Sequence, residues 1–171
     1  YLVNNSKFDH FQTITTPNSG MGLIDEFGAS VDVHGDRVAI GAPYKVNESM
    51  IPVGAAYVYK LNSGSSALVL ESIIEHPDSG EILYSRFGHA IDLHDNSLII
   101  GAPHQNREGE SDEFELFAAG GAWVTEWDPG LDEWTELTFL DPLDQHAEDL
   151  FGFDVAMIGD EVIVAAPGSD Y

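Results

Sequence analysis

Cysteine is absent from this chain, and basic residues are scarce. Only 6 Lys and Arg residues face 30 Asp and Glu residues, which gives a net charge of −24. Without cysteine, disulfide bonds are excluded as a source of stability. The shortage of basic residues argues against nucleic acid and anionic membranes as partners, because both bind to basic surfaces. The charge instead favours solubility and association with cations.

Several functional signatures are also missing. No apolar run approaches the ~20 residues that span a bilayer, so we expect no membrane insertion. The chain has neither a G-x-S-x-G element nor a glycine-rich phosphate-binding loop, and we therefore expect no enzyme. The seven histidines show no close spacing typical of zinc ligands; they are His10, His34, His76, His89, His94, His104 and His146.

What the chain does contain is enough apolar material for a packed core. Hydrophobic residues make up 43% of the sequence, and 3 Trp, 6 Tyr and 9 Phe are included. Intrinsic disorder is therefore disfavoured. The chain begins at Tyr1 without a methionine or a signal peptide, so we expect a processed product or a piece of a longer polypeptide.

An internal repeat organises the sequence. The segment FGASVDVHGDRVAIGAP at Phe27–Pro43 recurs as FGHAIDLHDNSLIIGAP at Phe87–Pro103 and as FGFDVAMIGDEVIVAAP at Phe151–Pro167. Each copy predicts a β-hairpin that starts at its phenylalanine. An alternating first strand leads into a two-residue turn, and a continuously apolar second strand follows. The small residues of the motif can be explained by packing and turn chemistry alone.

These segments resemble the FG-GAP repeat of integrin-α-type β-propellers and related bacterial and eukaryotic surface proteins. The resemblance rests on Phe-Gly at the start and Gly-Ala-Pro at the end of the first two copies, while Ala165 replaces the glycine in the third. It implies a four-stranded blade per repeat and an extracellular or cell-surface adhesion or binding role, not catalysis.

The predicted fold is all-β, with β-propeller blades of four antiparallel strands and about three blades' worth of strands. We divide the chain into the second half of a preceding blade (1–26), two blades (27–86 and 87–150) and the first half of a following blade (151–171). After each GAP motif we expect two further strands, at 55–61 with 68–74 and at 122–127 with 134–140. Residues 1–3 and 11–16 predict a matching pair that opens the chain.

The half blades at the two ends of the chain predict which partners complete the propeller. Closed propellers carry four to eight blades, so this chain is too short to close one in the usual way. Either further repeats of the same chain complete it, or other copies of the chain do so head to tail as a ring or filament. On the second interpretation the isolated chain is not a stable monomer. An extracellular protein or a glycan is an alternative ligand, as in a lectin.

The one cofactor that the sequence could accommodate is calcium, in the long insertion after the second GAP motif. Its candidate ligands are Glu108, Glu110 and Asp112, because calcium prefers several carboxylate oxygens. The alternative is a solvated acidic loop. The D-x-D-x-D-G cage that the family often carries between its first two strands does not fit the short turns here, so those calcium sites are not transferred. A second acidic group, read as a solvated rim, comprises Asp141, Asp144, Glu148 and Asp149.

Two further features are recorded as candidates. Asn4 and Asn47 begin glycosylation sequons, which matter only in a secreted eukaryotic protein. Trp123, Trp127 and Trp134 fall on the last two strands of the second predicted blade. We interpret them as core or inter-blade packing, with a sugar-stacking platform as the alternative.

Overall fold

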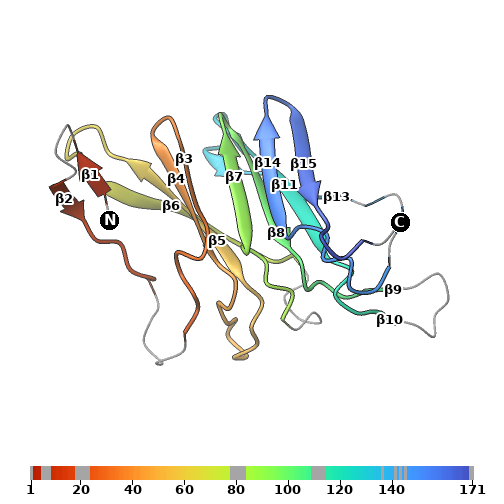
Figure 1. Cartoon of the computed structure of the whole chain (residues 1–171). Helices are drawn as coiled ribbons and strands as arrows, with labels where there is room; N and C mark the ends of the chain where they lie inside the picture. Colours follow the sequence, from red (N-terminus) through yellow and green to blue (C-terminus); the bar gives the residue numbers. More distant parts are fainter. Residues whose placement is uncertain are drawn as a thin grey trace.

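The structure is a computed structural model of the 171-residue chain. It describes residues 2–4, 9–17, 24–77, 84–108, 115–135, 137–140, 142, 144 and 146–169. Within these residues every regular element is a β-strand, and there is no helix that could cross a membrane. The strands form antiparallel sheets that stand one beside the next from the N-terminal to the C-terminal end of the chain (Figure 1).

The first complete sheet has the strand order β3-β4-β5-β6. We call it the first blade. Its strands are β3 (Val31–His34), β4 (Arg37–Ala42), β5 (Ala55–Leu61) and β6 (Leu68–Glu75). All neighbours in this sheet are antiparallel, as the alternation of apolar strands and polar turns predicts.

The second blade is built in the same way. Its path is β12-β11-β8-β7, and β13 also pairs with β11. The bounds are β7 (Ala90–His94), β8 (Ser97–Ala102), β11 (Gly121–Asp128), β12 (Glu133–Trp134) and β13 (Thr138–Leu140). The insertion between β8 and β11 adds a small antiparallel pair, β9 (Arg107–Glu108) with β10 (Glu115–Leu116).

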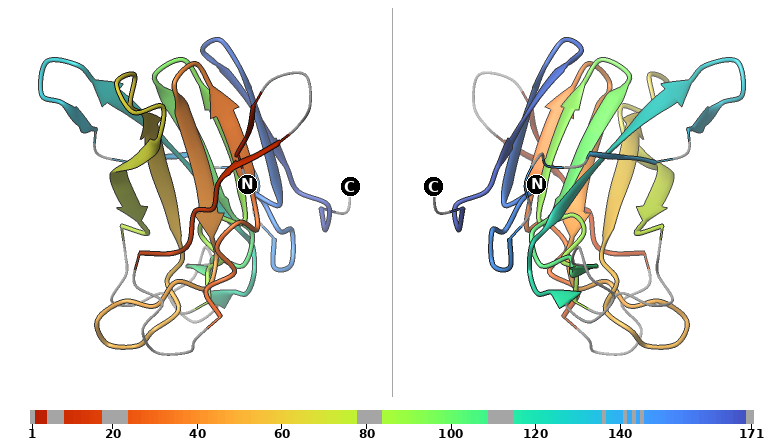
Figure 2. Two further views of the ribbon diagram at one scale, coloured as in Figure 1. Left: turned by 90° about the vertical axis from the view of Figure 1, so that its left-hand side faces the viewer. Right: turned by 90° about the vertical axis from the view of Figure 1, so that its right-hand side faces the viewer.

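Two isolated hairpins lie at the opposite ends of the row. The N-terminal one pairs β1 (Leu2–Asn4) with β2 (Asp9–Gln12). Its Gln12 side chain exchanges two hydrogen bonds with the backbone of Leu68 on β6. The terminal hairpin pairs β14 (Asp154–Ile158) with β15 (Glu161–Ala165) and packs against the second blade (Figure 2).

The predicted hairpin turns are present at the expected positions. Gly35, Asp95 and Gly159 adopt φ angles of 61°, 52° and 60°, the left-handed conformation that a two-residue turn between twisted strands requires. The second strands β4 and β8 are almost fully buried, as their continuous apolar runs predict. An all-β fold of β-propeller-like blades with four or five antiparallel strands is therefore confirmed.

Five expected strands differ from the structure. The first strands begin three or four residues later than predicted, because the glycine of each FG motif has a positive φ (Gly28 96°, Gly88 89°, Gly152 87°) and turns the chain. The strand expected at 11–16 ends at Gln12. Residues 134–140 form two short strands, whose pairing registers with β11 differ by one residue, so a bulge separates them.

Candidate functional site: the interfaces between blades

An aspartate in the middle of the first strand of each blade bonds to the next sheet. Asp32 on β3 accepts a hydrogen bond from the backbone N–H of Leu93 on β7, with an N–O distance of 2.7 Å. One repeat later, Asp92 on β7 accepts from the N–H of Met157 on β14 at 3.0 Å. The acceptor and the donor occupy equivalent repeat positions both times. A charged acceptor gives these bonds more strength than a neutral one.

Close backbone contact between glycines accompanies this bond. An ideal Cβ atom placed on Gly41 would lie 2.0 Å from the carbonyl oxygen of Gly88, and one on Gly101 would lie 2.1 Å from that of Gly152. No real Cβ fits at such distances. The GAP glycine of one sheet is therefore the place where the FG glycine of the next sheet docks. Ser30 adds a hydrogen bond from its Oγ to the Gly88 oxygen at 2.9 Å.

The interface between the first and second blades has an aromatic core. Phe87 and Trp123 are buried with their ring centroids 5.5 Å apart, and Phe139 packs 5.0 Å from Trp123. His76 is also buried, 4.7 Å from the Trp123 ring, and its Nε2 is 2.8 Å from Oε1 of Gln105. The interpretation of Trp123 as a packing residue agrees with this geometry.

The interface between the second blade and the terminal hairpin is smaller and mostly aliphatic. Its buried residues are Ala90, Ile99 and Val155. His89 lies at the same boundary, with its ring 5.2 Å from that of Phe153. Burial lowers the pKa of His89, and the Arg86 guanidinium lowers it further against the opposing charges of Glu26 and Asp154. Burial, Arg86 and His89 likewise lower the pKa of His104.

A buried arginine bridges the two blades near their hairpin turns. Arg37 on β4 donates from Nε and Nη2 to the two carboxylate oxygens of Glu71, at 2.7 and 3.0 Å. From the second blade, Asn96 Oδ1 accepts from its Nη1 at 3.2 Å, and the ring of Trp127 lies 4.5 Å from its Cζ. Trp134 lies behind at 5.7 Å. The paired guanidinium and the stacked ring explain how a charge is tolerated there.

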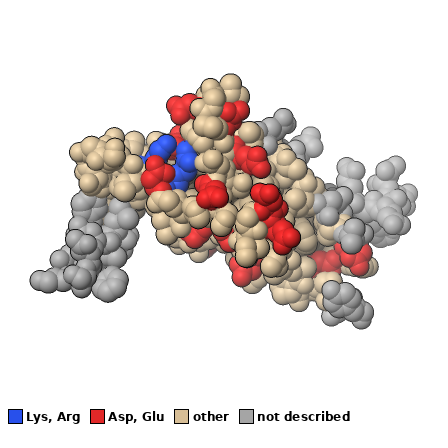
Figure 3. All heavy atoms as spheres, turned by 90° about the horizontal axis from the view of Figure 1, so that it is seen from above, with Lys and Arg blue, Asp and Glu red and all other residues tan. Residues whose placement is uncertain are grey.

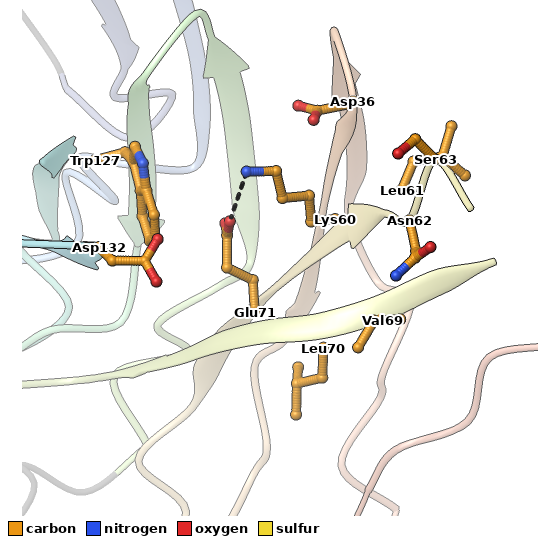
Figure 4. Close-up of a pocket in the computed structure, with 10 residues that line it drawn as sticks. All are labelled: Asp36, Lys60, Leu61, Asn62, Ser63, Val69, Leu70, Glu71, Trp127 and Asp132. Carbon is orange, nitrogen blue, oxygen red and sulfur yellow. Dashed lines mark ion pairs between the residues drawn. The ribbon is translucent and has the colours of Figure 1, made fainter. Parts of the chain in front are cut away.

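A cleft of about 530 Å³ opens beside this arginine, between the first blade and the β11–β12 turn. In Figure 4, Trp127 and Asp132 stand on one side, Asp36, Asn62 and Ser63 on the other, and Lys60 and Glu71 between them. The Lys60 Nζ lies 3.7 Å from Glu71 Oε1 and 5.8 Å from the Trp127 ring. Figure 3 shows basic side chains at one place only on the upper face, among scattered acidic ones.

Comparison with protein families agrees with this repeated geometry. A family model described as FG-GAP repeat matches residues 17–59 and residues 134–171. The chain is an FG-GAP repeat protein. FG-GAP repeats indicate a module of the integrin-like β-propeller type and are typical of extracellular and surface proteins. Comparison with curated proteins gives no match.

The predicted calcium ligands of this FG-GAP protein are not brought together in the described residues. Glu108 ends strand β9, and the placement of its side chain is not described. Glu110 and Asp112 lie outside the described residues. In the described ranges, no group of three His, Asp or Glu side chains could hold a metal ion. The calcium site stays a prediction.

The other sequence candidates have ordinary structural surroundings where they are described. Asn4 ends β1, and its side chain is not described. The Asn47 Oδ1 accepts hydrogen bonds from the N–H groups of Ser49 and Ile51, so this sequon lies in a tight turn. Of the second acidic group, Asp144 and Glu148 are exposed, whereas Asp149 is buried and accepts from the N–H of His146 at 2.7 Å. Asp141 is not described.

His34 and His94 face each other across the blade boundary. Their rings lie 4.8 Å apart, and the Asp95 carboxylate is 3.0 Å from His34 Nε2 and 4.0 Å from His94 Nε2. The two histidines occupy equivalent positions of the repeat, but the sequence did not predict this contact. Nor did it predict the roles of Asp32 and Asp92, whose signal was present: an aspartate recurs in the middle of two otherwise apolar first strands.

Proposed function

We propose that the chain is a non-enzymatic structural and adhesion module of the cell exterior, and that it acts by docking a further β-sheet on its first blade. The docking surface is the side of β3 and β4 that faces away from the second blade. We call it the back face; Val31, Val33, Val38 and Ile40 lie on it and pair across the hairpin, and Ile40 is already buried by residues of its own chain. Further repeats or other copies of the chain supply the partner.

One observation carries this proposal. Val31 and Val33 are 61% and 64% exposed, whereas Ile91 and Leu93 at the same positions of the second blade are 8% and 2% exposed. Val155 in the terminal hairpin is also buried. Each later repeat therefore uses this pair of residues to pack on the sheet before it. Leaving the pair in water forfeits about 1.5–3 kcal/mol per valine.

The test is the mass of the native particle from cells that export the chain. We expect a particle heavier than one chain, and we expect Val33→Asp to return it to the mass of one chain, because the carboxylate cannot be buried without a partner. Leu131→Asp is the matched control, since Leu131 is 66% exposed in the β11–β12 turn, away from the back face. A particle that survives Val33→Asp would contradict the proposal.

The cleft beside Arg37 favours a second candidate, the binding of a carbohydrate or a protein ligand. Trp127 supplies an aromatic wall, and Asp132 and Lys60 supply polar groups beside it. A glycan array tests this function. Selective binding that Asp132→Asn abolishes, with an unchanged melting temperature, would support it; the amide keeps the left-handed backbone of residue 132 accessible. Binding that is equal in the variant would exclude the cleft.

A further inference from the structure

The two internal interfaces show what one sheet must offer to receive the next. The receiving sheet presents an aspartate carboxylate to a backbone N–H, from Asp32 or Asp92. It also presents a glycine without a Cβ, Gly41 or Gly101, to a backbone carbonyl. These positions lie on opposite strands of one hairpin. Both features recur together, so we treat them as the requirement for stacking.

The terminal hairpin lacks both features. We call its side away from the second blade the front face; it carries Ala156, Ile158, Ile163 and Ala165, together with Asp154 and Glu161 at its edges. Ala156 stands where Asp32 and Asp92 stand, and Ala165 stands where Gly41 and Gly101 stand. An incoming sheet in the internal geometry would find no acceptor for its N–H, and its carbonyl oxygen would meet the Ala165 Cβ at about 2 Å.

The back face, in contrast, keeps what a docking sheet uses. Gly28 has a φ of 96°, close to the 89° of Gly88. At Gly88 an added Cβ would meet the Ala55 carbonyl oxygen at 2.3 Å, whereas at Gly28 no described heavy atom lies within 4 Å. The glycine is shaped to fit against a neighbouring backbone that the described residues do not supply. Exposed Val31 and Val33 lie beside it, so the back face keeps both the glycine and the apolar pair with which a sheet docks.

We infer that the back face docks on an FG-GAP-type sheet that carries an aspartate and a glycine at the positions of Asp32 and Gly41, and that the terminal hairpin of a second copy is not that sheet. This inference rests on the proposed function and names its partner. Of the two alternatives drawn from counting strands, it favours further repeats over copies of this chain that stack head to tail. The front face exposes Ile158 and Ile163, at 68% and 66%, beside the carboxylates of Asp154 and Glu161, but it does not accept another blade in the internal geometry.

The test restores the missing features in a probe chain. The probe carries Ala156→Asp and Ala165→Gly on its front face and Val33→Asp on its back face. It can therefore bind the back face of another chain, but its own back face cannot dock. We expect the unmodified chain alone to sediment as one chain, and the probe alone to do the same. Their equimolar mixture should sediment as a 1:1 complex. Circular dichroism and melting temperature check that each chain is folded.

Two controls assign the contact. Val33→Asp in the unmodified chain should abolish the complex, and a probe that carries only Val33→Asp should form none. If the unmodified chain alone associates and Val33→Asp prevents it, the back face docks as proposed but the inference about its partner is wrong. If the restored probe fails to bind a folded unmodified chain, the aspartate and the glycine do not define the partner, and the native-particle experiment still decides the proposed function separately.

Discussion

The two interfaces within the chain use the same backbone contacts but different side chains. Between the first and second blades, an aromatic core of Phe87 and Trp123 is closed by buried Arg37. Between the second blade and the terminal hairpin, the core is small and aliphatic. The aspartate bond and the glycine contact recur at both. The comparison indicates that backbone contacts set the spacing of sheets, while side chains determine how strongly each pair is held.

The largest expected effect removes the aromatic core of the first interface. Trp123→Ala should lower the free energy of unfolding by about 3–5 kcal/mol, because it leaves a large cavity among buried rings. Val155→Ala, in the second interface, deletes fewer buried carbons and should cost clearly less. Chemical denaturation of both variants measures the difference. Equal losses would mean that the two interfaces are held equally, against the comparison.

The next effect tests the contact that both interfaces share. Gly41→Ala and Gly101→Ala should each destabilise the chain by about 1–3 kcal/mol, because the new methyl group overlaps a backbone carbonyl of the next sheet. Ala165→Gly is the matched control, since its position faces no sheet in the described residues. Thermal unfolding should show a change within about 1 kcal/mol for it. If Gly41→Ala has little effect on stability, the two sheets can shift to accommodate the added methyl group.

A smaller effect is expected from the aspartate bonds. Asp32→Ala and Asp92→Ala should each cost about 1–2 kcal/mol, because each leaves a backbone N–H of the next sheet without its acceptor. Asp160→Ala, in an exposed hairpin turn, controls for the loss of one negative charge. Equilibrium denaturation at fixed salt compares them. If only one of the two variants lost stability, the two interfaces would differ in a way that the shared geometry does not predict.

The smallest effect is a pH dependence that belongs to the second interface. The pKa of His89 is lowered in the folded chain, so the folded state binds fewer protons than the unfolded state near the ordinary pKa of about 6.5. Its contribution to stability is present above that pH and is lost as the pH falls through 6.5 toward the folded pKa. His89→Gln should flatten the decline in melting temperature between pH 7.5 and 5.5; an unchanged slope would assign the decline to other groups.

Local patterns in the sequence predict much of this fold. Strand β5 coincides with its predicted range, and the hairpin turns fall where Gly35 and Asp95 predict them, because short-range backbone preferences decide both. The bulge in the last strand of the second blade was not predictable. It depends on how β12 and β13 each pair with β11, which no local pattern records.

The candidate site was predicted less well than the fold. The aspartate in the first strand of each blade carried a readable signal, since a charge recurred inside an apolar run. No such signal marked Arg37, which lies over the Trp127 ring and pairs with Glu71. These residues lie far apart in sequence, and Trp127 reaches Arg37 only when two sheets stack. The calcium prediction relied on carboxylate density alone, and density does not determine where side chains converge.

The placement of the tryptophans makes the chain report optically on one of its own interfaces. Trp123 lies against the His76 imidazole, and Trp127 lies under the Arg37 guanidinium with Trp134 beside it. All three indoles thus lie at the boundary of the first and second blades, so their emission depends on the surroundings at that boundary. Intrinsic fluorescence will therefore follow separation of these two blades, and it will be silent when the terminal hairpin, which has no tryptophan, detaches alone.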